Sequence, residues 1–235
     1  MKTANCFFKH GAVAVIWLCV LASVLAAESL TYRETEGGLT TTHTIVITPQ
    51  SPGYRIELQS RGAGGGVVLQ TFRTAADLST LAWTFQDAGR QMELSARRQG
   101  DAIVFSGNRR GEKIQERFNA SGAPWNQLFQ MGLAPFVLGD REETAFRSIA
   151  TQGPGELKIG KMSVTREGPE EIEMGGRKIA AIHVRISLSG LLSVFWHGDY
   201  WYRRSDGRFL RYRGKNRSGG PIAVSELIEE KVDEP

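Results

Sequence analysis

The chain has 235 residues, 41% of them hydrophobic and 23% charged, with a formal net charge of +4 at pH 7. This length is enough for one large core, and an all-β domain of this size is common. The two cysteines, Cys6 and Cys19, both lie near the N-terminus. The rest of the chain can therefore form no disulfide, no cysteine nucleophile and no cysteine-ligated metal site.

The N-terminus has the pattern of an export signal. Lys2 and Lys9 precede an uncharged apolar run over residues 12–25, and small residues follow that run. We expect residues 1–26 to be a signal peptide cleaved after Ala26, and residues 27–235 to form a single β-rich domain. The apolar run is shorter than the roughly 20 residues of a spanning helix, which disfavours the alternative of an uncleaved anchor. No transmembrane segment is expected after cleavage.

Cleavage would remove both cysteines, and an exported chain without cysteine is typical of the bacterial envelope. We therefore predict an exported protein, periplasmic in the first place and otherwise secreted. The remaining 27 basic and 25 acidic residues are unevenly spread, because residues 203–217 hold seven basic side chains and one acid. A basic stripe on an exported protein favours a lipid or another anionic envelope component as partner, or an envelope protein, and disfavours nucleic acid.

Short runs of β-branched or alternating apolar residues, bounded by Gly, Asn, Asp or Pro, predict strands along most of the chain. The predicted strands lie at residues 40–48, 54–59, 66–72, 81–85, 92–94, 103–105, 114–118, around 146, and at 157–164, 179–188, 194–214 and 222–228. Strands at this spacing predict an all-β fold, an antiparallel curved sheet or half-barrel, and not a βαβ array.

One segment, residues 124–137, departs from the strand period. Pro124 is tolerated in a first helical turn, and Trp125, Leu128 and Phe129 follow at helical spacing. Gly132 and Pro135 interrupt the pattern, so the sequence predicts one short, bent helix. In an all-β chain we expect such an apolar helix to plug the concave side of the curved sheet.

Several catalytic and nucleotide-binding patterns are absent or incomplete. The stretch GELKIGKM at residues 155–162 approaches a phosphate-binding loop, but Met162 stands where a serine or threonine is needed. No G-x-S-x-G sequence occurs, and the histidines lack the spacing of a metal motif. We therefore predict a protein that is not an enzyme, with no catalytic residue, no metal and no cofactor.

Residues 194–214 (VFWHGDYWYRRSDGRFLRYRG) predict an aromatic hairpin. Asp206-Gly207 is a strong signal for a two-residue turn, which would pair Trp201 with Tyr212 and Tyr202 with Arg211. The period of two then places Trp201, Arg203, Leu210 and Tyr212 on one face, predicted to be buried. The opposite face, predicted to be wet and cationic, carries Tyr200, Tyr202, Arg204, Phe209, Arg211 and Arg213.

Just before the hairpin, the sequence Trp196-His197-Gly198-Asp199 predicts a bulge, because a glycine inside a strand often marks one. His197 and Asp199 could then form a hydrogen-bonded pair. The candidate binding residues are, together, Trp196, His197, Asp199, Tyr200, Tyr202, Arg204, Arg211 and Arg213. A purely structural bulge is the alternative.

The pattern from Ile179 to Gly214 resembles uncharacterised bacterial exported proteins built as long antiparallel half-barrels. In this sequence "HVRISLSG" is followed by "FWHGDYWY", a D-G turn and "RFLRYRG". The architecture is also similar to the Lol-type lipoprotein carriers, in which a curved sheet wraps a helical plug around an apolar cavity. The resemblance carries over no individual functional residue, and the sequence has no lipobox.

These observations lead to a functional expectation. We expect an envelope protein that binds or carries an apolar or amphiphilic ligand, with an anionic head group held by the arginine-rich hairpin. The alternative is a structural or protein-interaction module that uses the hairpin or a sheet edge. An enzyme ranks third.

Overall fold

The computed structural model describes residues 26–151, 157–190, 196–217 and 219–232. The predicted signal peptide and its cysteines lie almost entirely outside this part of the chain. The strands are β1 (Glu28–Glu36), β2 (Leu39–Gln50), β3 (Gly53–Gly62), β4 (Val67–Thr74), β5 (Thr80–Asp87), β6 (Met92–Gln99), β7 (Ala102–Arg109), β8 (Glu112–Asn119), β9 (Glu143–Thr151), β10 (Leu157–Met174), β11 (Arg177–Leu188), β12 (His197–Arg203), β13 (Phe209–Lys215) and β14 (Ile222–Val232), and the helices are α1 (Phe129–Gly132) and α2 (Ala134–Leu138).

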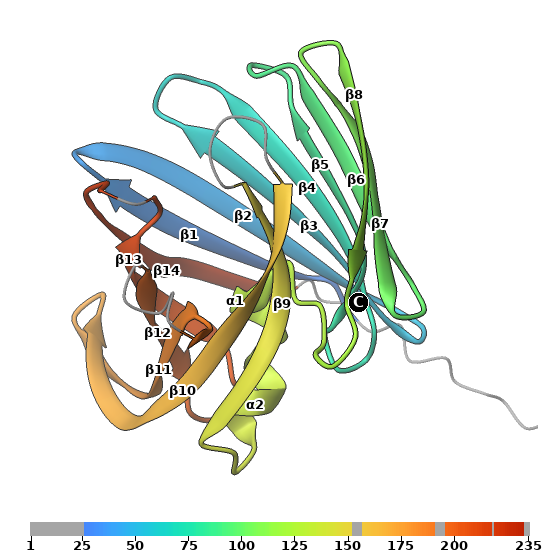
Figure 1. Cartoon of the computed structure of the whole chain (residues 1–235). Coiled ribbons are helices and arrows are strands. Elements are labelled where there is room, and N and C mark those ends of the chain that lie inside the picture. Colours follow the sequence, from blue (N-terminus) through green and yellow to red (C-terminus); the bar gives the residue numbers. More distant parts are fainter. Residues whose placement is uncertain (1–25, 152–156, 191–195, 218, 233–235) are drawn as a thin grey trace, which may run out of the picture.

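All of these strands belong to one antiparallel sheet, in the order β8-β7-β6-β5-β4-β3-β2-β1-β14-β13-β12-β11-β10-β9. The chain builds one half outward from β1 to β8, passes through the two helices to the far edge, and returns from β9 to β14. β14 then pairs with β1 over almost its whole length. The sheet is curved and does not close into a barrel (Figure 1), which confirms the all-β half-barrel predicted from the sequence.

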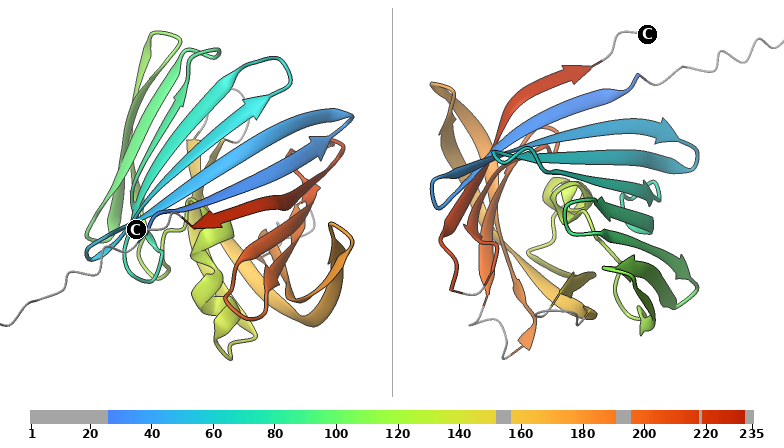
Figure 2. Two further views of the ribbon diagram at one scale, coloured as in Figure 1. Left: turned by 180° about the vertical axis from the view of Figure 1, so that it is seen from behind. Right: turned by 90° about the horizontal axis from the view of Figure 1, so that it is seen from above.

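The two helices lie on the concave side, between the two halves of the sheet, as the view from above shows (Figure 2, right). This confirms the predicted plug. Its start was predicted wrongly, because the helical turns begin at Phe129 and not at Pro124. Trp125 and its neighbours are extended instead, and the Trp125 backbone forms a parallel bridge with Arg147 of β9. Pro135 occupies the first turn of α2, where a missing backbone N–H costs nothing.

Strand β1 was not predicted from the sequence. Only Leu30 and Tyr32 are large apolar residues in a stretch rich in Glu and Thr, yet both are at most 2% exposed. The turn that follows has the preferred hairpin chemistry, since Gly37 and Gly38 both adopt positive φ, as a type I′ turn requires. β1 therefore forms a tight hairpin with β2 and fills the centre of the sheet.

The core lies on the concave side, where inward-facing residues of the strands meet the helical segment. Trp125 is fully buried, and Leu133, Phe136 and Val137 are at most 9% exposed. A smaller cluster forms on the convex side around Ile172, Ala181 and Leu210. Among the described residues, no helix has both the length and the apolar character needed to cross a membrane.

Candidate functional site

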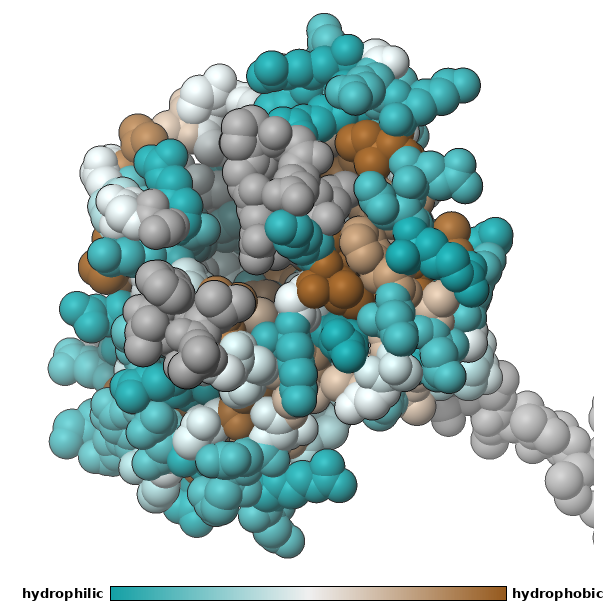
Figure 3. Space-filling model, in the orientation of Figure 1, coloured by the Kyte–Doolittle hydropathy of each residue, from teal (hydrophilic) through white to brown (hydrophobic). Residues whose placement is uncertain are grey.

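A cavity of about 530 Å³ remains on the concave side, above the plug. Trp125 and Phe136 belong to the buried core and not to the lining, whereas Phe129 at the start of α1 lines the cavity. In the same orientation as Figure 1, the space-filling view shows apolar surface near the middle of this face and hydrophilic surface around it (Figure 3). A ligand in this position would contact both halves of the sheet.

The lining combines apolar and polar side chains. The apolar residues are Ile45, Leu58, Leu128, Phe129, Met162, Leu188, Trp196 and Phe209, with Gly160 between them. The polar residues are Tyr32, Glu34, His43, Ser60, Gln70, Gln130, Ser148, Lys158, Tyr200, Tyr212, Asn216, Arg217 and Ser225. Polar residues outnumber apolar ones, but most of the exposed surface of the wall is apolar. An apolar surface with convergent polar groups is typical of small-molecule sites, and so is a volume within the range of about 300 to 1,000 Å³.

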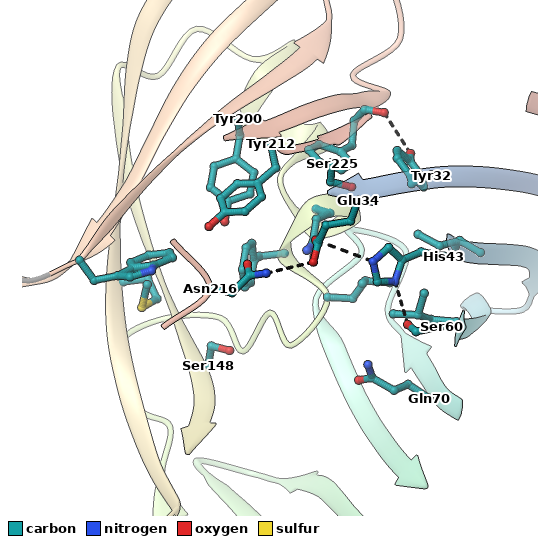
Figure 4. A pocket seen from close by; sticks show the side chains of 18 of the residues that line it. Tyr32, Glu34, His43, Ser60, Gln70, Ser148, Tyr200, Tyr212, Asn216 and Ser225 are labelled. Carbon is teal, nitrogen blue, oxygen red and sulfur yellow. Dashed lines mark hydrogen bonds and ion pairs between the residues drawn. The ribbon is translucent and has the colours of Figure 1, made fainter. Parts of the chain in front are cut away.

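Three adjacent strands carry a row of polar side chains into the cavity. His43 lies opposite Ser60 in the β2–β3 pairing, and its Nδ1 is 2.8 Å from the serine oxygen. Its Nε2 lies 3.7 Å from a carboxylate oxygen of Glu34 on β1, which is an ion-pair distance and longer than a hydrogen bond. The row therefore runs from serine through imidazole to carboxylate (Figure 4).

Glu34 is ionised in this setting. Burial raises the pKa of its carboxyl, but the neighbouring His43 imidazole and the amide of Asn216 outweigh burial, so the pKa lies below its usual value. The Asn216 amide donates to Glu34 at 3.0 Å and to Glu36 at 3.1 Å. Asn216, in the loop that follows β13, thus holds two carboxylates, of which Glu34 lines the cavity.

Tyr200 and Tyr212 face this row from the other half of the sheet, side by side, with ring centroids 4.9 Å apart. Both side chains are at most 6% exposed, and burial raises the pKa of both phenols. Neither hydroxyl makes a hydrogen bond to another of the described residues. Figure 4 shows both hydroxyls directed into the cavity.

The glycines beside these rings provide the space for them. Gly198 and Gly214 are paired across β12 and β13. A Cβ atom on Gly198 would lie 2.7 Å from Tyr212 Cε2, and one on Gly214 would lie 2.6 Å from the Tyr212 hydroxyl. The glycine in the predicted bulge therefore has a packing role. The bulge itself was predicted at the wrong place, because the β11–β12 register is continuous there.

The hairpin register was also predicted wrongly. Arg203 pairs with Arg208 around a four-residue loop, and Tyr202 lies opposite Phe209. A bulge at Leu210 then shifts the register, so that Trp201 lies opposite Arg211. A one-residue slip exchanges the faces of a strand. Tyr200, Tyr202, Phe209 and Tyr212 are consequently buried on the concave side, and the predicted wet tyrosine face does not exist.

Of the candidate binding residues, Trp196 and Tyr200 line the cavity. The Trp196 indole also donates a 2.7 Å hydrogen bond to the Lys215 carbonyl. Tyr202 is fully buried beside the plug, with its hydroxyl 3.4 Å from the Phe129 carbonyl oxygen. None of the other five, His197, Asp199, Arg204, Arg211 and Arg213, is part of the cavity lining.

Asp199 belongs to a network on the convex face. Its carboxylate lies 3.0 Å from His183 Nε2 and accepts from Arg185 at 3.2 Å. The predicted pair of His197 and Asp199 is therefore wrong, because His183, across the β11–β12 pairing, takes that place. The His183 ring also stacks on Trp201 at a centroid distance of 4.8 Å, which gives Asp199 a sufficient structural role.

Several hairpin arginines are likewise paired with acids. Arg211 donates to Glu226 at 2.7 Å, Arg203 pairs with Asp206 and Glu230, and Arg208 pairs with Glu28 and Glu230. These contacts join β12 and β13 to the strands at the centre of the sheet. They partly neutralise the basic stripe that the sequence suggested as a binding surface.

The serine, imidazole and carboxylate of the row are the residue types of a hydrolytic triad, but the arrangement lacks other parts of one. The imidazole is outside hydrogen-bond distance of Glu34. β2 and β3 each have a strand on both sides, so their backbone N–H groups serve the sheet and do not form an oxyanion hole. Within the described part of the chain, no cluster of three or more His, Cys, Asp or Glu side chains could hold a metal ion.

Sequence reasoning missed Glu34, His43 and Ser60 as site residues. The sequence does contain a signal for them. On each of the three strands a polar residue occupies the inward-facing position next to an inward-facing apolar residue, toward the same end of the sheet. His43 follows this rule next to Ile45, and Ser60 next to Leu58. Finding the row requires the pairing of three strands, and the first of these was not predicted.

No family model matches the chain, and no curated protein matches its sequence. Among solved structures, the chain is similar to the hypothetical lipoprotein YmcC from Escherichia coli K12, with 9% identity, a TM-score of 0.40, and 88% of this chain and 89% of that chain covered. It is also similar to a DUF1329 family protein from Desulfovibrio piger, with 10% identity, a TM-score of 0.31, and 90% and 87% covered. Neither name states an activity.

Proposed function

We propose that this protein is an exported envelope protein, periplasmic in the first place, that binds an amphiphilic molecule in the cavity of its curved sheet. The observation that supports this most is the cavity of about 530 Å³ between the two halves of the sheet. Side chains such as Leu58, Met162 and Trp196 would cover an apolar chain. The polar row at one end would contact the head group.

The apolar contribution to binding follows from area. Each methylene group moved from water into such a lining contributes about 0.8 kcal/mol, so a chain of several methylenes offsets the cost of immobilising the ligand. The polar groups contribute less affinity and more selectivity. We propose a binding or carrier role on this basis and not an enzymatic one, because the His43 imidazole is outside hydrogen-bond distance of Glu34 and the backbone N–H groups of β2 and β3 are used by the sheet.

Mass spectrometry under native conditions tests this proposal. The protein is expressed with its N-terminal segment, purified from the periplasm without detergent, and measured before and after incubation with an extract of envelope lipids. The proposal predicts an added mass of lipid size, released by organic solvent. A single apo mass in both samples would contradict it.

A matched pair of variants locates the binding. Gly160 lines the cavity, and a Cβ atom there has its nearest neighbours at 3.9 Å, so Gly160→Phe places a ring into the cavity. Lys161→Phe places the same ring at an exposed position of the same strand. The proposal predicts that the added mass is lost in the first variant and kept in the second. Equal binding by both variants would show that the ligand binds outside this cavity.

A further inference from the structure

The polar groups of the cavity are arranged by hydrogen-bonding type. On one side, the Glu34 carboxylate can only accept hydrogen bonds, and it already accepts one from Asn216 at 3.0 Å. On the other side, Tyr200 and Tyr212 direct their hydroxyls into the cavity. A phenol both donates and accepts, and a hydroxyl with no partner among the described residues leaves a strong donor for the ligand.

Gln70 adds a second kind of donor. Its side-chain oxygen accepts a 2.9 Å hydrogen bond from the Trp83 indole, so its amide NH₂ is the group left for the cavity that Gln70 lines. The hydroxyl of Ser60 also lies on this wall, next to His43. The site therefore presents donors from Gln70 and the two tyrosines together with a carboxylate acceptor.

Three kinds of head group can be compared with this arrangement. An ammonium group only donates hydrogen bonds, so it would satisfy Glu34 and leave the phenol donors unpaired. A carboxylate or phosphate only accepts, so it would satisfy the phenols and be attracted by Lys158 and Arg217, but it would be repelled by Glu34 at the point where the head group lies. A hydroxyl group donates and accepts at once. A head group with several hydroxyls satisfies both sides of the site without placing a second charge in it.

We propose that the cavity selects an amphiphile with a neutral, polyhydroxylated head group, a sugar or a glycerol, held between Glu34 and the hydroxyls of Tyr200 and Tyr212. This rests on the proposed function and replaces the anionic head group expected from the arginine-rich hairpin. Lys158 and Arg217 also line the cavity, and they balance the charge of Glu34 in the lining and of Glu36 beside it, which shares the Asn216 amide with Glu34. The surroundings of the site as a whole therefore suit a neutral ligand.

Isothermal titration with three dodecyl amphiphiles tests the selectivity. The probes are dodecyl maltoside, dodecanoate and dodecylammonium, each below its micelle concentration, with circular dichroism recorded to verify that the protein stays folded. The proposal predicts that the maltoside binds at least about tenfold more tightly than either charged probe. Equal affinities, or tightest binding of a charged probe, would overturn the proposal and leave amphiphile binding intact. Binding of none of the probes would instead contradict the proposed function.

Single-atom variants assign the selectivity to residues. Tyr200→Phe and Tyr212→Phe each remove one hydroxyl and should weaken maltoside binding about 2- to 12-fold. Tyr54→Phe, outside the cavity lining, should leave it unchanged. Glu34→Gln should reduce the ratio of the affinity for maltoside to the affinity for dodecanoate. Glu116→Gln, at an exposed position of β8, should leave this ratio unchanged. Unchanged maltoside affinity in both cavity tyrosine variants would overturn the assignment of the head-group site.

Discussion

The substitution Gly198→Ala adds one methyl group at the point where the two cavity tyrosines meet. The new Cβ atom would lie 2.7 Å from Tyr212 Cε2 and 3.1 Å from Tyr200 Cε2. Both rings are held between the sheet halves, and Phe129 packs edge-on against Tyr200 at a centroid distance of 5.7 Å. The rings can make room only by displacing their neighbours or by moving further into the cavity that they line, and either movement breaks the packing between them.

The expected cost follows from this crowding. Forcing an extra methyl group into a packed interior costs about 1 to 3 kcal/mol, and for a domain of this size each kcal/mol lowers Tm by about 2 to 4 °C. We therefore expect Tm to fall by about 2 to 12 °C. In an uncrowded strand, alanine is on average slightly more favourable than glycine, so a loss of stability points to the contact with the rings.

Thermal unfolding followed by circular dichroism measures the effect. Gly62→Ala is the matched control, because Gly62 is also a strand residue and a Cβ atom there meets nothing within 4 Å. Replacing Tyr212 by Leu should relieve part of the cost, and the two substitutions should couple by about 0.5 to 3 kcal/mol. A Gly198→Ala protein as stable as the Gly62→Ala control would refute the reasoning.

Three further predictions concern other parts of the structure. Burial raises the pKa of Tyr200 and Tyr202, so both keep their protons in the folded state above pH 10, where tyrosines of the unfolded chain ionise. The contribution of these groups to the free energy of unfolding should be constant well below pH 10 and fall above it, with a loss of about 0.8 kcal/mol for each tyrosine by pH 10.5. Urea unfolding at pH 8 and pH 10.5 should therefore show a smaller loss of stability for Tyr202→Phe than for the unmodified protein. An equal loss in the two proteins would count against a buried phenol. Asp199→Asn removes the charged partner of His183 and should cost about 1 kcal/mol of stability while ligand affinity stays within twofold; a tenfold loss of affinity would place Asp199 in the binding site after all. Trp125→Ala, at a fully buried position, should cost about 3 to 5 kcal/mol in urea unfolding, and a cost under about 1 kcal/mol would contradict the described packing of the plug.

Much of the fold follows from local sequence signals, because most strands carry inward apolar residues at alternate positions and end at turn residues. Tyr54, Ile56 and Leu58 in β3 are one such run, and the structure places a strand there. The local pattern of β1 does not predict a strand, because its two inward-facing apolar residues are surrounded by glutamates and threonines. Its stability comes from β2 and β14 on either side, and these partners cannot be read from the local pattern.

The candidate site was harder to predict, since it depends on register. The signal at Asp206-Gly207 is compatible with a two-residue turn, but the chain uses a four-residue loop and a bulge at Leu210. Each of these features shifts the pairing, and a shift of one residue exchanges the buried and exposed faces. Tyr200 and Tyr202 were therefore wrongly placed on a wet face; Tyr200 lines the cavity, Tyr202 does not, and Tyr212, which was not among the candidates, does.

The central claim is that the concave cavity binds the ligand, and competition by a side chain placed inside it tests this most directly. Isothermal titration of dodecyl maltoside into the unmodified protein, Gly160→Phe and Lys161→Phe gives three affinities, with Tm measured for each protein as a control for folding. We expect the inward ring of Gly160→Phe to weaken binding at least about tenfold and the outward ring of Lys161→Phe to leave it unchanged. Equal affinities in three folded proteins would contradict the account.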